Sequence, residues 1–182
     1  PAHTPRTAAD MASDLHALIN ALGMSKPVLV GHSFGGPICL SFAAAWPDEI
    51  AGLVLVDPTH PEQFDTFGPL LPDQLVDMKE FWTKGWRTPD GTAERIDFQR
   101  TFAAIREIGS LGDLPLTVLT SGAWQFTDEA HQTWIRFHRE YVALSNRGKQ
   151  RVLPNTDHFL QRSAPNEVIE AISEVLDELR LN

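Results

Sequence analysis

The sequence predicts an α/β fold in which a mainly parallel sheet is flanked by helices. Three short apolar runs end at turn-forming residues, as buried parallel strands do. Segments with apolar residues spaced by three and four separate these runs, and this alternation is typical of βαβ units. Hydrophobic residues make up 42% of the 182 residues, which is enough for the core of one domain that carries an insertion.

The first part of the chain predicts two strands, each preceded by a helix. Residues 7–22 have helical spacing and lead to an apolar run at 27–30, which we expect to be a strand buried on both faces. The Ala-rich stretch 37–46 predicts a buried helix. A second strand at 53–56 follows and closes before Pro58, because proline cannot donate to a ladder.

More than fifty residues separate this strand from the third one, at 116–119, which is far more than a crossover helix requires. The sequence therefore predicts an insertion. Within it, residues 58–72 are rich in Pro, Phe and Gly and are expected to be irregular. Residues 73–84 and 93–108 each have helical spacing.

The last part of the chain predicts two helices around a short strand. A helix over 127–144 begins with Thr127 as its N-cap. A strand at 151–153 and a loop at 154–158 lead to a final amphipathic helix over 165–181.

The composition excludes several classes of protein. The net charge of −9, from 15 Lys and Arg against 24 Asp and Glu, argues against electrostatic binding of nucleic acid. No apolar run is long enough for a membrane span, and residues 1–6 lack the apolar stretch of a secretory signal. The single Cys39 excludes an internal disulfide and a multi-cysteine metal site. We expect a soluble, cytoplasmic protein without metal, cofactor or nucleic-acid partner.

One motif indicates a nucleophilic serine. Gly31-His32-Ser33-Phe34-Gly35 matches G-x-S-x-G between a predicted strand and a predicted helix, which is the context that this motif requires. On such a turn the serine has strained backbone angles, and we expect a side chain at either flanking glycine to collide with its neighbours. Ser33 is therefore the candidate nucleophile. The N–H of Phe34, at a helix start, is a candidate donor to an oxyanion.

A serine nucleophile needs a base, and the chain has seven histidines. His158 is the candidate, because it lies in the loop between the last predicted strand and the last helix. His60 is a candidate at the site entrance. The other histidines considered are expected to be structural or solvated: His16 on a helix face, His32 within the motif, and His131 and His138 on the exposed side of a later helix.

Together these residues resemble the α/β-hydrolase superfamily, in its cap-bearing branch with a serine nucleophile. The resemblance rests on the motif at 31–36, on the strand that ends at Asp57-Pro58 and on the late loop Asp157-His158-Phe159, and it covers essentially the whole chain in the expected order. It implies an α/β-hydrolase core at 1–57 and 113–182 and a helical cap insertion at 58–112.

The resemblance implies one of two positions for the carboxylate of a catalytic triad. Family members usually carry it a few residues after the strand assigned here to 116–119, where residues 122–125 offer none and Asp128 comes later. The other position is the end of the preceding strand, where Asp57 stands. Asp57 is the expected acid and Asp128 the alternative. Asp157 adjoins His158 in sequence and is poorly placed to orient that imidazole.

The resemblance also implies strands ahead of the first one predicted here. Only 26 residues precede Pro27, and they hold one helix and no loop with a His-Gly pair that would supply a second oxyanion donor. We therefore expect the N-terminal part of the sheet to be missing from this chain. The strand at 28–30 is then expected to have an unpaired edge.

The predicted function is hydrolysis of an ester-type (acyl) bond through an acyl-enzyme. Dehalogenase and epoxide-hydrolase chemistry is disfavoured, because those relatives have an Asp in place of Ser33. Two alternatives stay open: a cofactor-free perhydrolase, and a non-catalytic or truncated hydrolase-fold protein that acts by binding. The aromatic residues of the insertion predict a small-molecule substrate with an apolar acyl or aromatic group: Phe64, Phe67, Phe81, Trp82 and Trp86. His32, His60 and Trp82 are candidate substrate contacts, and the oligomeric state stays open.

Overall fold

The computed structural model describes residues 4–67, 86–87, 93–122 and 127–180. Their central feature is a parallel four-stranded sheet in the order β1-β2-β5-β6. The strands are β1 (Val28–His32), β2 (Gly52–Val56), β5 (Leu116–Ser121) and β6 (Gly148–Leu153). Because all four run in one direction, their carboxyl ends meet at one edge of the sheet. The predicted α/β fold with a parallel sheet is confirmed.

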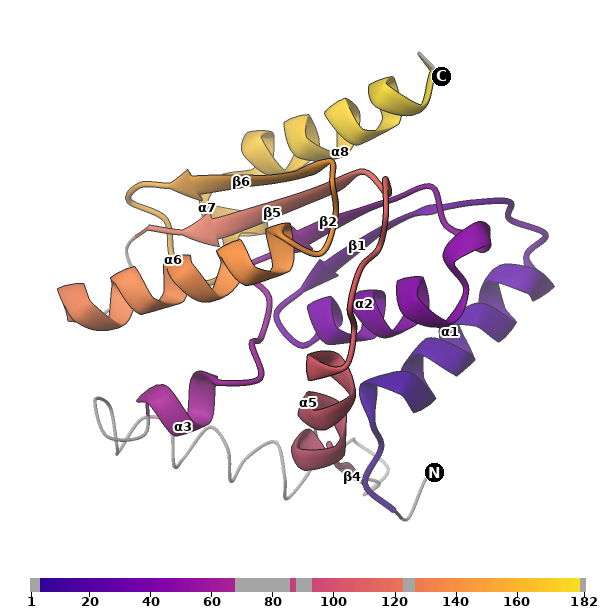
Figure 1. Cartoon of the computed structure of the whole chain (residues 1–182), viewed down its shortest axis with the longest axis horizontal. Coiled ribbons are helices and arrows are strands. Elements are labelled where there is room, and N and C mark those ends of the chain that lie inside the picture. Colours follow the sequence, from indigo (N-terminus) through magenta and orange to yellow (C-terminus); the bar gives the residue numbers. More distant parts are fainter. Residues whose placement is uncertain (1–3, 68–85, 88–92, 123–126, 181–182) are drawn as a thin grey trace.

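Helices cover both faces of the sheet (Figure 1). On one face lie α2 (Gly35–Ala45), which contacts β1, and α6 (Asp128–Val142), which contacts β5 and β6. α1 (Ala8–Ala21) packs against α2. α8 (Pro165–Arg180) covers the opposite face, and the short α7 (Leu160–Ser163) precedes it. A 3-10 turn at Pro47–Glu49 joins α2 to the segment before β2.

The helix starts follow from local sequence. Thr7 is the N-cap of α1, and its hydroxyl accepts the N–H of Asp10 in a capping box. Thr127 caps α6 in the same way by accepting the N–H of Ala130, as the sequence predicts. Each cap satisfies a backbone donor that the helix itself leaves without an acceptor.

The core consists of buried apolar clusters on the two faces of the sheet. Successive side chains of β2 point to opposite faces and so belong to both clusters. Leu53 and Leu55 face the cluster around α2, whereas Val54 and Val56 face the cluster around α8. All four side chains are at most 2% exposed. The sequence of a strand that is buried on both faces is an unbroken run of apolar residues, and β2 has this pattern.

The insertion between β2 and β5 contains α3 (Gln63–Phe67), α5 (Phe98–Arg106) and a small pair of strands, β3 (Trp86–Arg87) and β4 (Ala93–Glu94). The expected irregular structure over 58–72 is wrong at α3. The helix predicted at 73–84 lies outside the described residues. α5 packs against α2, so this end of the insertion shares the core of the main domain.

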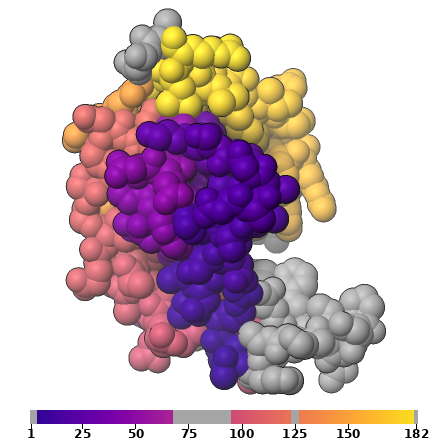
Figure 2. All heavy atoms as spheres, turned by 90° about the vertical axis from the view of Figure 1, so that its right-hand side faces the viewer, coloured from indigo at the N-terminus to yellow at the C-terminus, as the bar shows by residue number. Residues whose placement is uncertain are grey.

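β1 differs from its prediction. Burial on both faces is wrong for Val30, which is 45% exposed, whereas Leu29 is 8% exposed. β1 pairs with β2 on one side, and no strand in the described part of the chain pairs with its other side. Figure 2 shows the molecule from the right-hand side of Figure 1, where the atoms of the N-terminal residues (indigo) lie below those of the C-terminal helix (yellow).

Two further properties concern individual elements. Among the described helices, none has the length and apolar character needed to cross a lipid bilayer. Cys39 is a buried free cysteine on α2, and burial raises the pKa of its thiol to about 12. The thiol therefore stays protonated near neutral pH and acts as a small apolar side chain of the core.

Candidate active site

Ser33 follows β1 on a strained turn that leads directly into α2. Its φ of 54° lies in the left-handed region, which costs energy for a residue with a side chain. Its N–H donates to Val56 O at 3.0 Å, and its carbonyl accepts from the N–H groups of Gly36 and Thr59, each at 3.0 Å. These bonds join the turn to the end of β2 and hold Ser33 at the carboxyl edge of the sheet.

Close packing requires glycine at two positions of this turn. A Cβ on Gly31 would lie 2.4 Å from Gly35 O, and one on Gly36 would lie 2.5 Å from Pro58 Cβ. A Cβ on Gly35 would meet nothing within 4 Å, so the expected crowding at both glycines that flank Ser33 is wrong at Gly35. The contact at Gly36 brings the start of α2 against the loop that follows β2.

Asp57 follows β2, also with a positive φ, of 45°, and it is completely buried. Within the described part of the chain, its Oδ1 accepts hydrogen bonds from Ser121 N at 2.9 Å, from Ser121 Oγ at 2.8 Å and from Trp134 Nε1 at 2.9 Å. Its Oδ2 lies 2.8 Å from His158 Nδ1. The carboxylate therefore has a fixed orientation, with one oxygen held by the surrounding core and the other directed to the imidazole.

The surroundings of Asp57 favour its charged form. Burial by itself raises the pKa of Asp57, but the hydrogen bond from His158, the electrostatic influence of His138 and the N–H of Ser121 together hold it below its usual value. The side chain is therefore a carboxylate near neutral pH, and it accepts hydrogen bonds on both oxygens.

His158 lies in the loop between β6 and α7, with its side chain 24% exposed. Its carbonyl accepts a hydrogen bond from His32 Nε2 at 2.8 Å, and the two imidazole rings lie 4.5 Å apart. Because a carboxylate only accepts, the proton of the bond between His158 and Asp57 belongs to Nδ1 of the imidazole. In the neutral ring Nε2 is then the acceptor nitrogen.

The sheet brings these residues together from distant parts of the sequence. Ser33, Asp57 and His158 follow β1, β2 and β6, and all three strands end at the same edge. The site thus contains a hydroxyl on a strained turn, an imidazole and a buried carboxylate. Within the residues that the structure describes, no group of three or more His, Cys, Asp or Glu side chains is arranged to hold a metal ion.

The two other carboxylates considered from the sequence lie outside this arrangement. Asp128 is exposed in the first turn of α6. Asp157 accepts the N–H of Phe159 at 2.9 Å and the hydroxyl of Ser163 at 3.2 Å, and it stabilises the turn into α7. Asp57 is the carboxylate that the fold places against the imidazole of His158.

The candidate substrate contacts have different positions. His32 is half-buried beside His158, and burial lowers its pKa. His60 is only 4% exposed and stacks on Phe137 with ring centroids 4.3 Å apart, so it is part of the packed interior. Burial lowers the pKa of His60 to about 3, which keeps it neutral. Trp82 lies outside the described residues.

The expectation that His131 and His138 share the exposed side of α6 is wrong. His138 is fully buried, with Nδ1 2.9 Å from Thr120 Oγ1 and Nε2 2.9 Å from Pro58 O. Burial lowers its pKa to about 4. His131 is half-buried, and its Nε2 lies 3.3 Å from Ser121 O. The amphipathic face of α6 that packs inward includes these polar residues.

Sequence reasoning missed Ser121 and Trp134, which both donate to Asp57 Oδ1. The signal for Ser121 was its place at the end of a strand next to β2, since carboxyl ends of neighbouring parallel strands meet. The signal for Trp134 was its spacing from His138 and Tyr141, which places the three residues on one face of α6.

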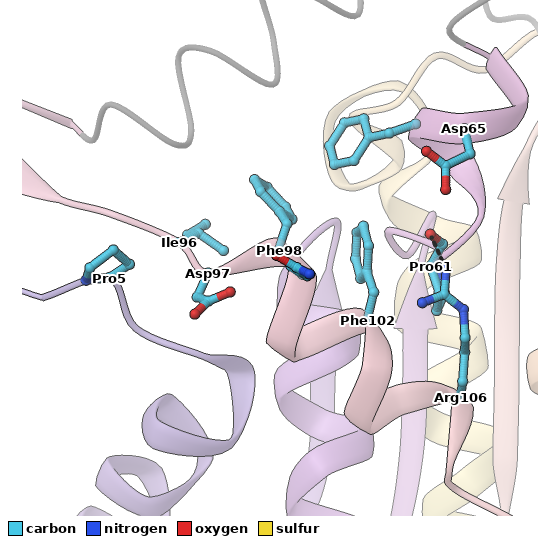
Figure 3. A pocket seen from close by; sticks show the side chains of 10 residues that line it. Pro5, Pro61, Asp65, Ile96, Asp97, Phe98, Phe102 and Arg106 are labelled. Carbon is cyan, nitrogen blue, oxygen red and sulfur yellow. Dashed lines mark hydrogen bonds between the residues drawn. The ribbon is translucent and has the colours of Figure 1, made fainter.

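A pocket of about 570 Å³ is lined by residues of α3 and α5. Figure 3 shows Phe98 and Phe102 projecting from successive turns of α5 toward α3, which carries Asp65. The ring of Phe34, the residue after Ser33, packs edge-on against Phe98 with centroids 5.5 Å apart. The pocket is therefore linked to the turn that carries Ser33.

Aromatic and charged side chains share the walls of this pocket. Arg106 Nε donates to Glu62 Oε1 at 2.6 Å, and its guanidinium also donates to Pro61 O at 3.2 Å. Its charge is thus paired with a carboxylate at the edge of the pocket. The carboxylates of Asp65 and Asp97 lie among the lining groups.

Comparison with known proteins agrees with the fold described above. Residues 1–84 match the family model for the alpha/beta hydrolase fold. Over 173 residues the chain is 29% identical to "Uncharacterized protein YqjL" of Bacillus subtilis, covering 93% of this chain and 65% of that protein. It is 23% identical over 219 residues to Epoxide hydrolase 3 of Xenopus tropicalis, covering 92% of this chain and 57% of that protein. The chain thus spans less than two thirds of the length of these curated relatives.

Among solved structures, a thermophilic esterase from Thermogutta terrifontis aligns with a TM-score of 0.60 and 21% identity, covering 97% of this chain and 74% of that one. Together with the family match, this similarity shows that the chain has the α/β-hydrolase fold. The superfamily resemblance predicted from the sequence is confirmed at the level of the fold.

Proposed function

We propose that this chain carries the catalytic residues of a serine hydrolase that cleaves an ester-type bond through an acyl-enzyme, with Ser33 as nucleophile, His158 as base and Asp57 as acid. The observation that carries the proposal is the 2.8 Å hydrogen bond between His158 Nδ1 and Asp57 Oδ2, at the sheet edge where the strained Ser33 turn begins. This bond directs Nε2 of the imidazole away from the carboxylate, as a general base requires.

In the proposed mechanism His158 Nε2 takes the proton of Ser33 Oγ as this oxygen attacks the substrate carbonyl carbon. The carbonyl oxygen becomes an oxyanion. When the tetrahedral intermediate collapses, the bond to the leaving alcohol breaks and the alcohol takes the proton from His158. Water then gives a proton to His158 and attacks the acyl-serine, the carboxylic acid leaves, and the proton returns to Ser33 Oγ.

Asp57 supports these proton transfers without being protonated itself. It fixes the imidazole in the tautomer with a proton on Nδ1 and stabilises the imidazolium that forms. The bonds from Ser121 and Trp134 to Oδ1 hold the carboxylate in place before the reaction, so little reorganisation is needed when charge develops.

Phe34 is the proposed oxyanion donor. It is the N-cap of α2 and directly follows the nucleophile. The positive end of the helix dipole lies at this position, which favours a developing negative charge. One such donor contributes about 10²- to 10³-fold to kcat in a well-studied protease.

The substrate class follows from the pocket beside the Ser33 turn. Its walls include the side chains of Phe64, Phe98 and Phe102, and this favours an apolar acyl or aromatic group. The lining carboxylates Asp65 and Asp97 disfavour an anionic group. We propose residues 58–112 as a cap over a core formed by 1–57 and 113–182, because α3 and α5 supply these walls.

The nucleophile is tested with a serine-directed phosphonate and intact-mass analysis. One phosphonyl group is expected on the chain, and none on Ser33→Ala, because the phosphorus is attacked by the activated Oγ. Ser13→Ala, which removes a hydroxyl on the exposed side of α1, is the matched control and is expected to be labelled like the parent chain. An adduct on Ser33→Ala, or no adduct on the parent chain, would overturn the assignment.

The substrate class is tested by comparing p-nitrophenyl butyrate with the p-nitrophenyl monoester of succinate, which differs by a terminal carboxylate. The neutral ester is expected to have the higher kcat/KM. Phe98→Ala is expected to raise KM for the neutral ester, because it removes an aromatic wall. Equal kcat/KM for the two esters would exclude charge selection by the pocket.

A further inference from the structure

We infer that one face of α6 is a positioning surface that holds the loop Asp57–Pro61, and with it the carboxylate that binds His158. We call this surface the α6 clamp and define it as Trp134, Phe137, His138 and Tyr141. The inference rests on the proposed function, because it assigns these side chains a role in the proposed hydrolytic site. They act through Asp57 and its loop rather than on the reacting atoms.

The clamp binds the first two residues of the loop through ring nitrogens. Trp134 Nε1 donates to Asp57 Oδ1 at 2.9 Å. His138, one helical turn later, donates from Nε2 to Pro58 O at 2.9 Å. The rings of Trp134 and His138 also lie 4.5 Å apart, so each one limits the movement of the other.

The clamp continues along the next two loop residues. Tyr141 donates its hydroxyl proton to Thr59 O at 2.7 Å. Phe137 stacks on His60 with an angle of 8° between the ring planes. Four consecutive loop residues, from Asp57 to His60, are thus each contacted by a different side chain of α6.

The spacing of the clamp residues explains how one helix reaches four successive residues of the loop. Positions 134, 137, 138 and 141 are separated by three, one and three residues, so they form one stripe along the helix surface. All four side chains are at most 4% exposed. The stripe therefore faces the loop along its whole length.

A second layer of hydrogen bonds fixes the proton on His138. Gln150 Nε2 on β6 donates to Thr120 Oγ1 and to Ile135 O, both at 3.0 Å. Thr120 in turn lies 2.9 Å from His138 Nδ1 and supplies its hydroxyl proton there, because Nε2 must carry the proton for Pro58 O. This chain of bonds selects the tautomer that the loop requires.

The loop needs such support for two reasons. Asp57 has a φ of 45°, a conformation that persists only when the surrounding structure enforces it. The carbonyl groups of Pro58 and Thr59 belong to buried residues, where each carbonyl needs a donor. The clamp supplies both donors, so the geometry of the acid and the hydrogen bonding of its loop depend on the same helix face.

The decisive variants remove one donor and keep an aromatic side chain at the position: Trp134→Phe and Tyr141→Phe. Trp134→Phe is expected to lower kcat for a p-nitrophenyl ester about tenfold, with KM unchanged within about twofold, because it removes one hydrogen bond to a charged acceptor. The acidic limb of its kcat/KM profile is expected to move to higher pH, because Asp57 keeps more negative charge without this donor and favours the protonated form of the imidazole beside it. Tyr141→Phe acts on Thr59, two residues away, and is expected to have a smaller effect in the same direction.

A pair of variants at His138 provides a test by rescue. His138→Leu removes the donor to Pro58 O, and His138→Gln offers an amide N–H in its place. The Gln variant is expected to retain more activity than the Leu variant. If His138→Leu fails to fold, Trp134→Phe and Tyr141→Phe still decide the question, because both keep an aromatic side chain in the buried position.

The control separates positioning from general stability. Val175→Ala removes buried side-chain volume on α8, on the opposite face of the sheet, and is expected to lower Tm without changing kcat or the pH profile. If Trp134→Phe and Tyr141→Phe also lower Tm alone, and kcat and the pH profile stay those of the parent chain, the α6 clamp has a purely structural role and the inference is wrong.

Amide hydrogen exchange tests the clamp independently of activity. The N–H of Asp57 donates to Leu119 O at 2.8 Å and that of Thr59 donates to Ser33 O at 3.0 Å, so both report opening of the loop. At both amides, exchange in Trp134→Phe is expected to be at least tenfold faster than in Val175→Ala. If the parent chain hydrolyses no ester but this acceleration is seen, the proposed function fails while the clamp stands as a holder of the loop. Equal exchange rates would reject the clamp itself.

Discussion

The two loops that meet at the site are fixed in opposite ways. The acid loop, Asp57–Pro61, is buried along its whole length and receives donors from β5, α6 and α5. The base loop, residues 154–159, is exposed at four of its six positions. It is held largely by its own side chains, for example by Thr156 Oγ1, which donates to Leu153 O at 2.6 Å.

This difference follows from what each residue is proposed to do. A carboxylate that only orients and stabilises an imidazole acts best when it is fixed and shielded from water. A base that exchanges protons with a substrate and with water needs an accessible nitrogen. The exposed fraction of the side chain is 0% for Asp57 and 24% for His158, although one hydrogen bond joins them.

The largest effect is expected from a variant that breaks the hydrogen bond between the two loops. Asp57→Asn is expected to lower kcat on a p-nitrophenyl ester about 10⁴-fold, because the imidazole loses its orienting carboxylate and takes the wrong tautomer. Asp128→Asn is the matched control and is expected to change kcat less than about tenfold, because Asp128 is exposed at the start of α6. If Asp128→Asn lowers kcat more than Asp57→Asn does, the acid is Asp128 and the assignment of Asp57 is wrong.

The acid loop and the α6 clamp that packs on it are also expected to make stability depend on pH. Burial lowers the pKa of His138 from 6.5 to about 4 and that of His60 from 6.5 to about 3. Between these values and pH 6.5 the unfolded chain binds protons that the folded chain does not, so the free energy of unfolding falls as the pH drops below 6.5. Between pH 6.5 and 4.5 the loss is about 5 kcal/mol, because each histidine contributes about two pKa units at about 1.4 kcal/mol per unit.

Urea unfolding at successive pH values between 7.5 and 4.5 measures this loss. His138→Gln is expected to make the curve shallower, because glutamine does not titrate. A slope that is the same in the variant and in the parent chain would exclude His138 as a source of the pH dependence.

A smaller effect is expected where the Ser33 turn meets the acid loop. Gly36→Ala places a Cβ 2.5 Å from Pro58 Cβ and is expected to destabilise the fold by about 1–3 kcal/mol. Gly35→Ala meets nothing within 4 Å and is expected to be neutral or slightly stabilising, because alanine suits a helix better than glycine. Thermal unfolding of both variants checks this, and equal Tm values would mean that Pro58 moves aside without cost.

The smallest effect is expected in the base loop. Asp157→Ala removes the acceptor of the Phe159 N–H in an exposed segment, where water replaces the lost bond. The free energy of unfolding is expected to fall by about 1 kcal/mol or less, and kcat by less than about tenfold. A larger loss of kcat would show that the base loop is fixed as strictly as the acid loop.

Local patterns predicted most of the secondary structure. The apolar runs at 53–56 and 116–119 and the spacing within residues 7–22 depend on neighbours in sequence, and all three elements form as expected. Several of the wrong predictions concern the burial of side chains, which depends on tertiary packing. Val30 is apolar like its neighbours, yet it is exposed because β1 ends the described sheet on that side.

The sequence by itself identified the Ser33 turn, since the glycine pattern between a strand and a helix reflects local steric limits that hold in any protein. It also indicated His158 from chain order. Asp57 and Asp128 each suit their local position, as a turn residue before proline and as a helix-start residue, so local rules left both open.

Only the tertiary structure decided which carboxylate meets the imidazole and what holds it. That outcome depends on the strand order, which sets β2 beside β5, and on the rotation of α6, which turns Trp134 and His138 toward the acid loop. Helical periodicity shows which side chains share a face, but the partner of that face depends on how the helix docks on the sheet. His138, a polar residue expected in solvent, is buried because its two ring nitrogens find partners in Thr120 and Pro58.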